Sequence, residues 1–179
     1  MYRLFAALAL PDDIALRLQG MCGGVPGAFW ETPENLHLTL RFVGDVPGDV
    51  AEDVAHALAS VRHAPFELEF AGVGHFSSGP VVRVLWAGLR KSESLLAVRA
   101  RIESALRRID LPGDGRRFIP HVTLAKLEDP SVPKVQEWLA AHALFKAGPF
   151  AVDRFALYSS VRAGASRAYE REAEFLLRA

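Results

Sequence analysis

HLTL at residues 37–40 recurs as HVTL at residues 121–124, so the chain carries the pattern H-x-T-x twice. The dipeptide PF at 65–66 recurs as PF at 149–150, with the same offset as the two tetrapeptides. Two repeats in one register indicate an internal duplication, and the offset is far longer than the periods of solenoid proteins. We therefore predict one domain, spanning residues 1–179, that is built from two related and interleaved lobes.

Hydrophobic patterns predict the same order of elements in both halves of the chain. Short apolar or alternating runs are typical of strands, whereas apolar residues spaced three and four apart are typical of helices. The expected strands are 2–10, 35–43, 66–70, 81–89, 118–127 and 150–158, and the expected helices are 12–20, 49–61, one from Ser92 and one from Pro133. Asp12, Asp49 and Ser92 are the expected helix caps.

These elements predict the fold class. Helices packed on small sheets with antiparallel strands make an α+β domain. We predict a bilobal, duplicated fold in which two small, mostly antiparallel sheets with outer helices enclose a central cleft about a pseudo-twofold axis. The two H-x-T-x strands are expected to face each other across that cleft.

Composition limits the function classes. Half of the 179 residues are hydrophobic, which is enough for a buried core. The formal net charge is zero, which argues against a non-specific grip on long nucleic acid and favours a small or terminal substrate. No apolar run reaches the roughly 18 residues of a membrane-spanning helix, and the apolar start reads as a strand rather than a signal peptide. We expect a cytoplasmic monomer that does not bind membranes.

Alternation along a strand places the polar residues of each motif on one face. His37 and Thr39 point one way and the leucines between them the other, and the same holds for His121 and Thr123. If the lobes pack about a twofold axis, two imidazoles and two hydroxyls meet in one groove. Arg41 has the same parity as His37 and is expected to extend that face.

Two imidazoles and two hydroxyls suit the cleavage of a phosphodiester. One neutral imidazole can activate water while a protonated one donates to the departing oxygen. Hydroxyls can donate hydrogen bonds to the non-bridging phosphoryl oxygens, where charge develops. A single such motif is weak, because threonine is common in strands, but two copies at one offset favour function. We predict His37 and His121 as catalytic residues and Thr39 and Thr123 as phosphate-binding residues.

Other chemistries lack their motifs in this sequence. No histidine or cysteine pair has zinc-site spacing such as H-E-x-x-H or C-x-x-C. There is no P-loop, no G-x-G-x-x-G and no G-x-S-x-G. The single cysteine, Cys22, cannot form an internal disulfide. We therefore expect an enzyme that needs neither a metal nor a cofactor.

The two motifs and their flanks resemble the 2H phosphoesterase superfamily, specifically the bacterial RNA 2′,3′-cyclic phosphodiesterases that are also called 2′-5′ RNA ligases. The similarity covers nearly the whole chain. It includes RLFAA at 3–7, Trp30, PENLHLTLRFVG at 33–44, VLWAG at 84–88, FIPHVTLAK at 118–126 and LYSS at 157–160.

The resemblance implies a specific reaction. A terminal 2′,3′-cyclic phosphate on RNA would be hydrolysed to a 2′-phosphate, with a weak, reversible 2′-5′ joining activity. By analogy, His37 is the proton donor and His121 the proton acceptor, although the near-twofold symmetry leaves acid and base open. Lys126 stands where the family often has arginine. It is expected to contact substrate less well, because it lacks the bidentate fork and has the opposite parity to Thr123.

An aromatic side chain is expected to stack on the terminal base. Phe5, Trp30, Phe42 and Phe76 are candidates, each with core packing as the alternative role. Two other functions stay open at this point. One is a phosphodiesterase of small cyclic nucleotides or ADP-ribose cyclic phosphate, and the other is a non-catalytic module that binds RNA ends.

Overall fold

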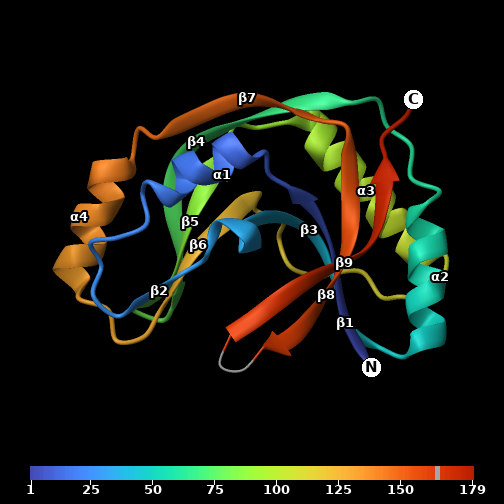
Figure 1. Cartoon of the computed structure of the whole chain (residues 1–179), viewed down its shortest axis with the longest axis horizontal. Coiled ribbons are helices and arrows are strands. Elements are labelled where there is room, and N and C mark those ends of the chain that lie inside the picture. Colours follow the sequence, from blue (N-terminus) through green and yellow to red (C-terminus); the bar gives the residue numbers. More distant parts are fainter. Residues whose placement is uncertain (164–165) are drawn as a thin grey trace.

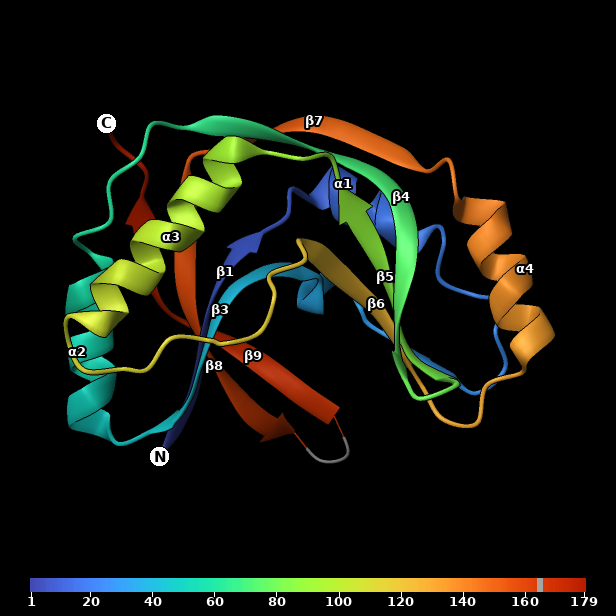
Figure 2. The same cartoon turned by 180° about the vertical axis from the view of Figure 1, so that it is seen from behind.

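The computed structural model describes residues 1–163 and 166–179 (Figures 1 and 2). The helices are α1 (Asp12–Gln19), α2 (Gly48–Leu58), α3 (Glu93–Arg107), α4 (Val132–His142) and the 3₁₀-helix η1 (Pro33–Asn35). The strands are β1 (Tyr2–Ala9), β2 (Ala28–Trp30), β3 (His37–Val46), β4 (Phe66–Ser78), β5 (Val81–Leu89), β6 (His121–Leu127), β7 (Lys146–Val152), β8 (Arg154–Ala163) and β9 (Ser166–Leu176).

The strands form two similar halves that meet at the motif strands. The order is β7-β4-β5-β6 in one half and β3-β1-β8-β9 in the other, with β2 added to β6. Every recorded pairing is antiparallel, and β3 joins β6 only through Leu38 and Val122. The predicted α+β fold with antiparallel sheets is confirmed. The two predicted sheets are continuous through this one junction.

The helices cover the outer side of both halves. Helices α2 and α3 lie side by side against the β1 and β3 half, and α4 lies at the opposite end against β4 (Figures 1 and 2). Helix α1 follows β1 in the chain but contacts β7, while α3 follows β5 but contacts β3. The first helix of each repeat therefore packs on the other half.

The hydrophobic core lies between the sheet and these helices. The motif residues that alternate with His and Thr supply its centre, since Leu38, Leu40, Val122 and Leu124 are buried. Each buried leucine or valine contributes about 1.5–3 kcal/mol relative to exposure. Burial of this face fixes the register of both motif strands and turns the polar residues to the opposite face.

The helix expected from Pro133 is present, with Pro133 in its first turn, and one of the three predicted caps is confirmed. The hydroxyl of Ser92 accepts a hydrogen bond from the backbone N–H of Leu95, as predicted for a cap. The prediction that Asp12 and Asp49 act as caps was wrong, because each lies inside the first turn and a proline precedes the helix. Their carboxylates still favour the positive end of the helix dipole.

The C-terminal strands depart most from the sequence prediction. The single strand expected at 150–158 is divided into β7 and β8, which pair with different neighbours, β4 and β1. Strand β9 was missed. It pairs with β8 alone, at the sheet edge, and its charged residues hide the alternation that a half-buried strand shows.

A β-bulge occurs at the same place in both motif strands. The register of β3 with β1 skips Leu40, and the register of β6 with β5 skips Leu124. A bulge adds one unpaired residue, so the following side chains switch faces. The duplicated pattern thus includes the bulge as well as the histidine and the threonine.

Candidate active site

The four polar motif residues lie on one face at the junction of the two halves. Leu38 and Val122 are paired and buried, so their strand neighbours project to the other face. Extending this antiparallel register by one residue sets His37 opposite Thr123 and Thr39 opposite His121. Each imidazole is therefore beside the hydroxyl of the other motif.

Both imidazoles are held in the same tautomer by the backbone. Nδ1 of His37 lies 2.7 Å from the carbonyl oxygen of Asn35, and Nδ1 of His121 lies 2.6 Å from that of Ile119. A carbonyl only accepts, so Nδ1–H donates in both cases. In the neutral imidazole Nε2 then carries the lone pair, so it can accept a proton and, once protonated, donate one.

Burial lowers the pKa of both histidines from the usual 6.5. For His37 the carbonyl of Asn35 opposes this effect, and the charges of His121 and Lys126 lower the pKa further. For His121 the carbonyl of Ile119 opposes the effect of burial. Each ring is thus readily neutral in the free protein, and an anionic phosphate in the groove would favour its protonated form.

Aromatic rings surround each histidine. The ring centroid of His37 is 4.9 Å from that of Phe5 and 5.0 Å from that of Tyr169. The ring of His121 lies edge-on to Phe76 at 4.8 Å and 5.8 Å from Trp86. These rings restrict both imidazoles and exclude water, which is also the source of the desolvation that lowers their pKa values.

The structure separates the four aromatic candidates. Phe5 is only 2% exposed and packs against His37. Trp30 packs on the core-side residue Trp138, with ring centroids 5.9 Å apart. Phe42 is 49% exposed and Phe76 is half-buried beside His121, so these two present ring surface at the site.

Arg41 does not project from the same strand face as His37 and Thr39, and it reaches the cavity beside His121 only from the wall on the α3 side. The bulge at Leu40 turns its side chain to the side covered by α3, where Nε lies 2.8 Å from a carboxylate oxygen of Glu103. Both side chains are less than a tenth exposed. The guanidinium also donates to the carbonyl oxygens of Phe42 and Pro112. Arg41 is thus fixed in a buried ion pair, because strand parity fails at the bulge.

Lys126 also lies on the face opposite to the one that strand parity predicts, again because of a β-bulge. The bulge at Leu124 turns it to the face of the histidines, where its charge lowers the pKa of His37. Its Nζ is 4.0 Å from a carboxylate oxygen of Glu31. The parity argument against Lys126 was therefore wrong, and a cation stands near His37.

Sequence reasoning missed several residues near the site. Tyr158 and Tyr169 come from β8 and β9, and Tyr169 was hidden because β9 was not predicted. Glu31 is partly buried, and burial raises the pKa of its carboxyl. Phe29 is 62% exposed and is paired with Lys126 across β2 and β6. The alternation of Phe29 with the core-facing Trp30 could have indicated it.

Neither a thiol nucleophile nor a metal cluster is present among the described residues. Burial raises the pKa of the Cys22 thiol to about 11, so it is a poor nucleophile near neutral pH. In the ranges 1–163 and 166–179, no three His, Cys, Asp or Glu residues are grouped as they would be around a metal ion. The same ranges contain no helix with the length and hydrophobicity of a bilayer-spanning segment.

Comparisons with known proteins agree with this geometry. A family model described as the 2′-5′ RNA ligase superfamily matches residues 30–164. An RNA 2′,3′-cyclic phosphodiesterase of Thermus thermophilus is 33% identical over 145 residues, which cover 74% of this chain and 72% of that protein. One of Aquifex aeolicus is 28% identical over 152 residues, covering 83% and 81%.

Solved structures show the same fold. E. coli LigT in complex with 3′-AMP matches 98% of both chains with a TM-score of 0.80 and 26% identity. The protein TT0787 of Thermus thermophilus matches 98% of both chains with a TM-score of 0.78 and 27% identity. The predicted family is confirmed: this chain belongs to the 2′-5′ RNA ligase superfamily of 2H phosphoesterases.

Proposed function

We propose that this protein is an RNA 2′,3′-cyclic phosphodiesterase that hydrolyses a terminal cyclic phosphate to a 2′-phosphate. One observation carries the proposal. Two imidazoles stand on strands that pair at Leu38 and Val122, and each is fixed by a backbone carbonyl through Nδ1, which leaves its Nε2 available for proton transfer. The names of the relatives support the same activity.

The reaction needs four groups of the chain. His121 accepts a proton from water while the water oxygen attacks phosphorus. The bond from phosphorus to the 3′-oxygen breaks, and His37 gives its proton to that oxygen. Thr39 and Thr123 donate hydrogen bonds to the non-bridging oxygens as charge develops. The products are a 2′-phosphate and a free 3′-hydroxyl, and a 5′-hydroxyl in place of water would give a 2′-5′ linkage.

The assignment of His37 as donor and His121 as acceptor is part of this proposal and follows the family resemblance. Lys126 adds a positive charge near His37, which suits an anionic phosphate in the groove. A cytoplasmic location and a monomeric state also belong to the proposal.

Turnover of three substrates tests the function. We expect hydrolysis of an RNA oligonucleotide that ends in a 2′,3′-cyclic phosphate, with a 2′-phosphate as the only product. EDTA should leave the rate unchanged, because no described residues form a metal cluster. A 2′,3′-cyclic mononucleotide and ADP-ribose cyclic phosphate should be turned over more slowly than the oligonucleotide.

Each rival has its own outcome in this assay. Faster turnover of either small substrate would make the protein a small-molecule phosphodiesterase. Tight binding of the oligonucleotide without turnover would make it a binding module. Activity lost in EDTA and restored by a divalent ion would show that a metal, and not the histidine pair, activates water.

A further inference from the structure

A cavity beside His121 is built differently from the rest of the active-site groove. It has a volume of about 260 Å³, and Thr39 and His121 line it, so it is continuous with the catalytic residues. Its other walls come from β3, β4, α3 and the loop at 114–119. Three phenylalanines and four arginines are among its lining residues: Phe42, Phe76, Phe118, Arg41, Arg99, Arg116 and Arg117.

The arginines of this cavity exceed the carboxylates that neutralise them. Arg41 and Arg99 share the carboxylate of Glu103, at 2.8 and 3.4 Å. The guanidinium of Arg116 donates two hydrogen bonds to the carboxylate of Asp114, at 3.0 and 3.1 Å. Arg117 is exposed and forms no ion pair with any residue in the described ranges. Four guanidinium groups against two carboxylates leave a net charge of +2, in a chain whose formal charge is zero.

The aromatic side chains add stacking surface to this charge. The guanidinium of Arg99 already lies over the ring of Phe118, at 4.5 Å from its centroid. Phe42 is 49% exposed and lines the same cavity as Phe76. Proteins hold single-stranded RNA with this combination, because bases stack on aromatic rings while cations follow the phosphates.

The cavity on the other side of the catalytic centre has the opposite character. It has a volume of about 450 Å³ and contains His37, Tyr158 and Tyr169. Asp12 and Glu34 are the charged residues on its wall, and no lysine or arginine of the described part of the chain lines it. An anionic strand that extends from the reacting phosphate is therefore attracted to the side of His121.

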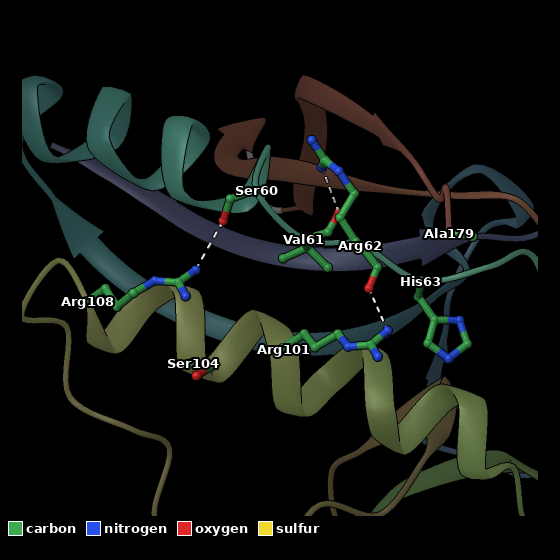
Figure 3. Close-up of a pocket in the computed structure, with 8 residues that line it drawn as sticks. All are labelled: Ser60, Val61, Arg62, His63, Arg101, Ser104, Arg108 and Ala179. Atoms are coloured by element: carbon green, nitrogen blue, oxygen red, sulfur yellow. Dashed lines mark hydrogen bonds between the residues drawn. The ribbon is translucent and has the colours of Figure 1, made fainter.

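A second arginine-lined cavity lies on the outer side of the molecule and provides a contrast (Figure 3). Arg101 donates to the backbone carbonyl of Arg62 at 2.5 Å, and Arg108 donates to the hydroxyl of Ser60 at 3.1 Å. The guanidinium of Arg62 turns away from these two, toward the carbonyl oxygens of its own segment (Figure 3). Among the residues that the structure describes, no phenylalanine, tyrosine or tryptophan lines this cavity. Its one ring is the imidazole of His63, so among the residues that the structure describes it offers less stacking surface than the cavity beside His121.

We propose that the cavity beside His121 binds a second nucleotide of an RNA strand, with its phosphate at Arg117 and its base against Phe42 or Phe76. This inference rests on the proposed function and adds a substrate preference to it. The nucleotide can come from the strand that carries the cyclic phosphate or from an incoming strand with a 5′-hydroxyl. Both sources offer the same chemistry, a base next to a phosphodiester.

Hydrolysis of matched substrates tests the cavity. Wild-type protein should have a kcat/KM at least about tenfold higher for a trinucleotide ending in a cyclic phosphate than for the 2′,3′-cyclic mononucleotide, since base stacking and one phosphate contact are gained. The ratio of the two kcat/KM values, trinucleotide over mononucleotide, should fall about fivefold to tenfold in Arg117→Ala and depend less on salt concentration. Arg117→Lys should restore most of the ratio. Phe42→Ala should also lower the ratio. Arg108→Ala, in the outer cavity, should leave the ratio unchanged.

A joining assay shows which RNA strand occupies the cavity. Formation of 2′-5′ linkages with a 5′-hydroxyl oligonucleotide is measured for the same variants. A loss confined to joining assigns the cavity to the incoming strand, and a loss in hydrolysis assigns it to the substrate strand. Both outcomes support the proposal. Unchanged ratios and unchanged joining in Arg117→Ala and Phe42→Ala overturn it.

Binding separates this inference from the proposed function. The affinity for a fluorescent trinucleotide with a 2′-phosphate end can be followed by anisotropy without any turnover. If the wild type hydrolyses no cyclic phosphate, the proposed function fails, yet weaker binding by Arg117→Ala but not Arg108→Ala still supports the cavity. Equal affinity of the two variants contradicts it.

Discussion

Replacing either His37 or His121 with alanine should lower kcat/KM for cyclic-phosphate-ended RNA by about 10²–10⁴-fold, the usual range for general acid–base catalysis. Each imidazole has its tautomer fixed through Nδ1, so its Nε2 is set to transfer a proton and the loss of either ring removes that transfer. The double replacement should cost much less than the product of the two single losses, because acid and base act as a unit.

The control for this experiment is His56→Ala. His56 is exposed on α2, away from the groove, and its loss should change kcat/KM by less than about twofold. Circular dichroism should show that all variants keep the fold. Wild-type turnover by either single variant at His37 or His121 would eliminate the two-histidine mechanism.

Replacing Glu103 with alanine should destabilise the fold by about 3–5 kcal/mol, because it leaves the buried guanidinium of Arg41 without its carboxylate. The two side chains are less than a tenth exposed and lie 2.8 Å apart. Arg99, which also contacts Glu103, loses its partner as well. Urea unfolding should show a lower midpoint with a similar slope.

An exposed ion pair at the start of the same helix is the matched control. Glu93 pairs with Lys91 at 2.8 Å, but both side chains are more than three-quarters exposed. Glu93→Ala should cost no more than about 1 kcal/mol. If Glu103→Ala lowers the free energy of unfolding no more than Glu93→Ala does, the buried ion pair of Arg41 and Glu103 does not stabilise the fold as proposed.

The sequence predicted the elements that follow from hydrophobic patterning. Both motif strands, the pairing of His with Thr on one face and the helices that cover the sheet are consequences of side-chain alternation and burial. The strand at 81–89 and the cap at Ser92 were predicted with their observed bounds. These features depend on residues that are close in the chain.

The errors have one physical origin: they depend on pairing between distant strands. The bulges at Leu40 and Leu124 exist only in register with β1 and β5, and they exchange the expected places of Arg41 and Lys126. Edge strand β9 pairs on one side alone and carries Tyr169 to His37. A period-two pattern reports which face a residue occupies only until a bulge intervenes.

The pH dependence of kcat/KM tests the two-histidine mechanism most directly. One ring must be neutral and the other protonated, so the profile should be bell-shaped, and both limbs belong to the coupled pair. Because burial lowers the pKa of both rings, the maximum should lie on the acid side of 6.5. The profile of kcat should lie at higher pH, since bound phosphate favours the imidazolium.

The pH profile of the Lys126→Gln variant tests whether the charge of Lys126 acts on His37. This substitution removes a charge that lowers the pKa of His37, so one limb should move to higher pH. Lys134→Gln, at an exposed pair on α4, should leave the profile in place. The account predicts a bell-shaped profile of kcat/KM with its maximum on the acid side of pH 6.5, in which one limb shifts in Lys126→Gln and neither shifts in Lys134→Gln. A rate that climbs steadily from about pH 6 to about pH 10 would instead indicate attack by hydroxide or metal-bound water and would contradict it.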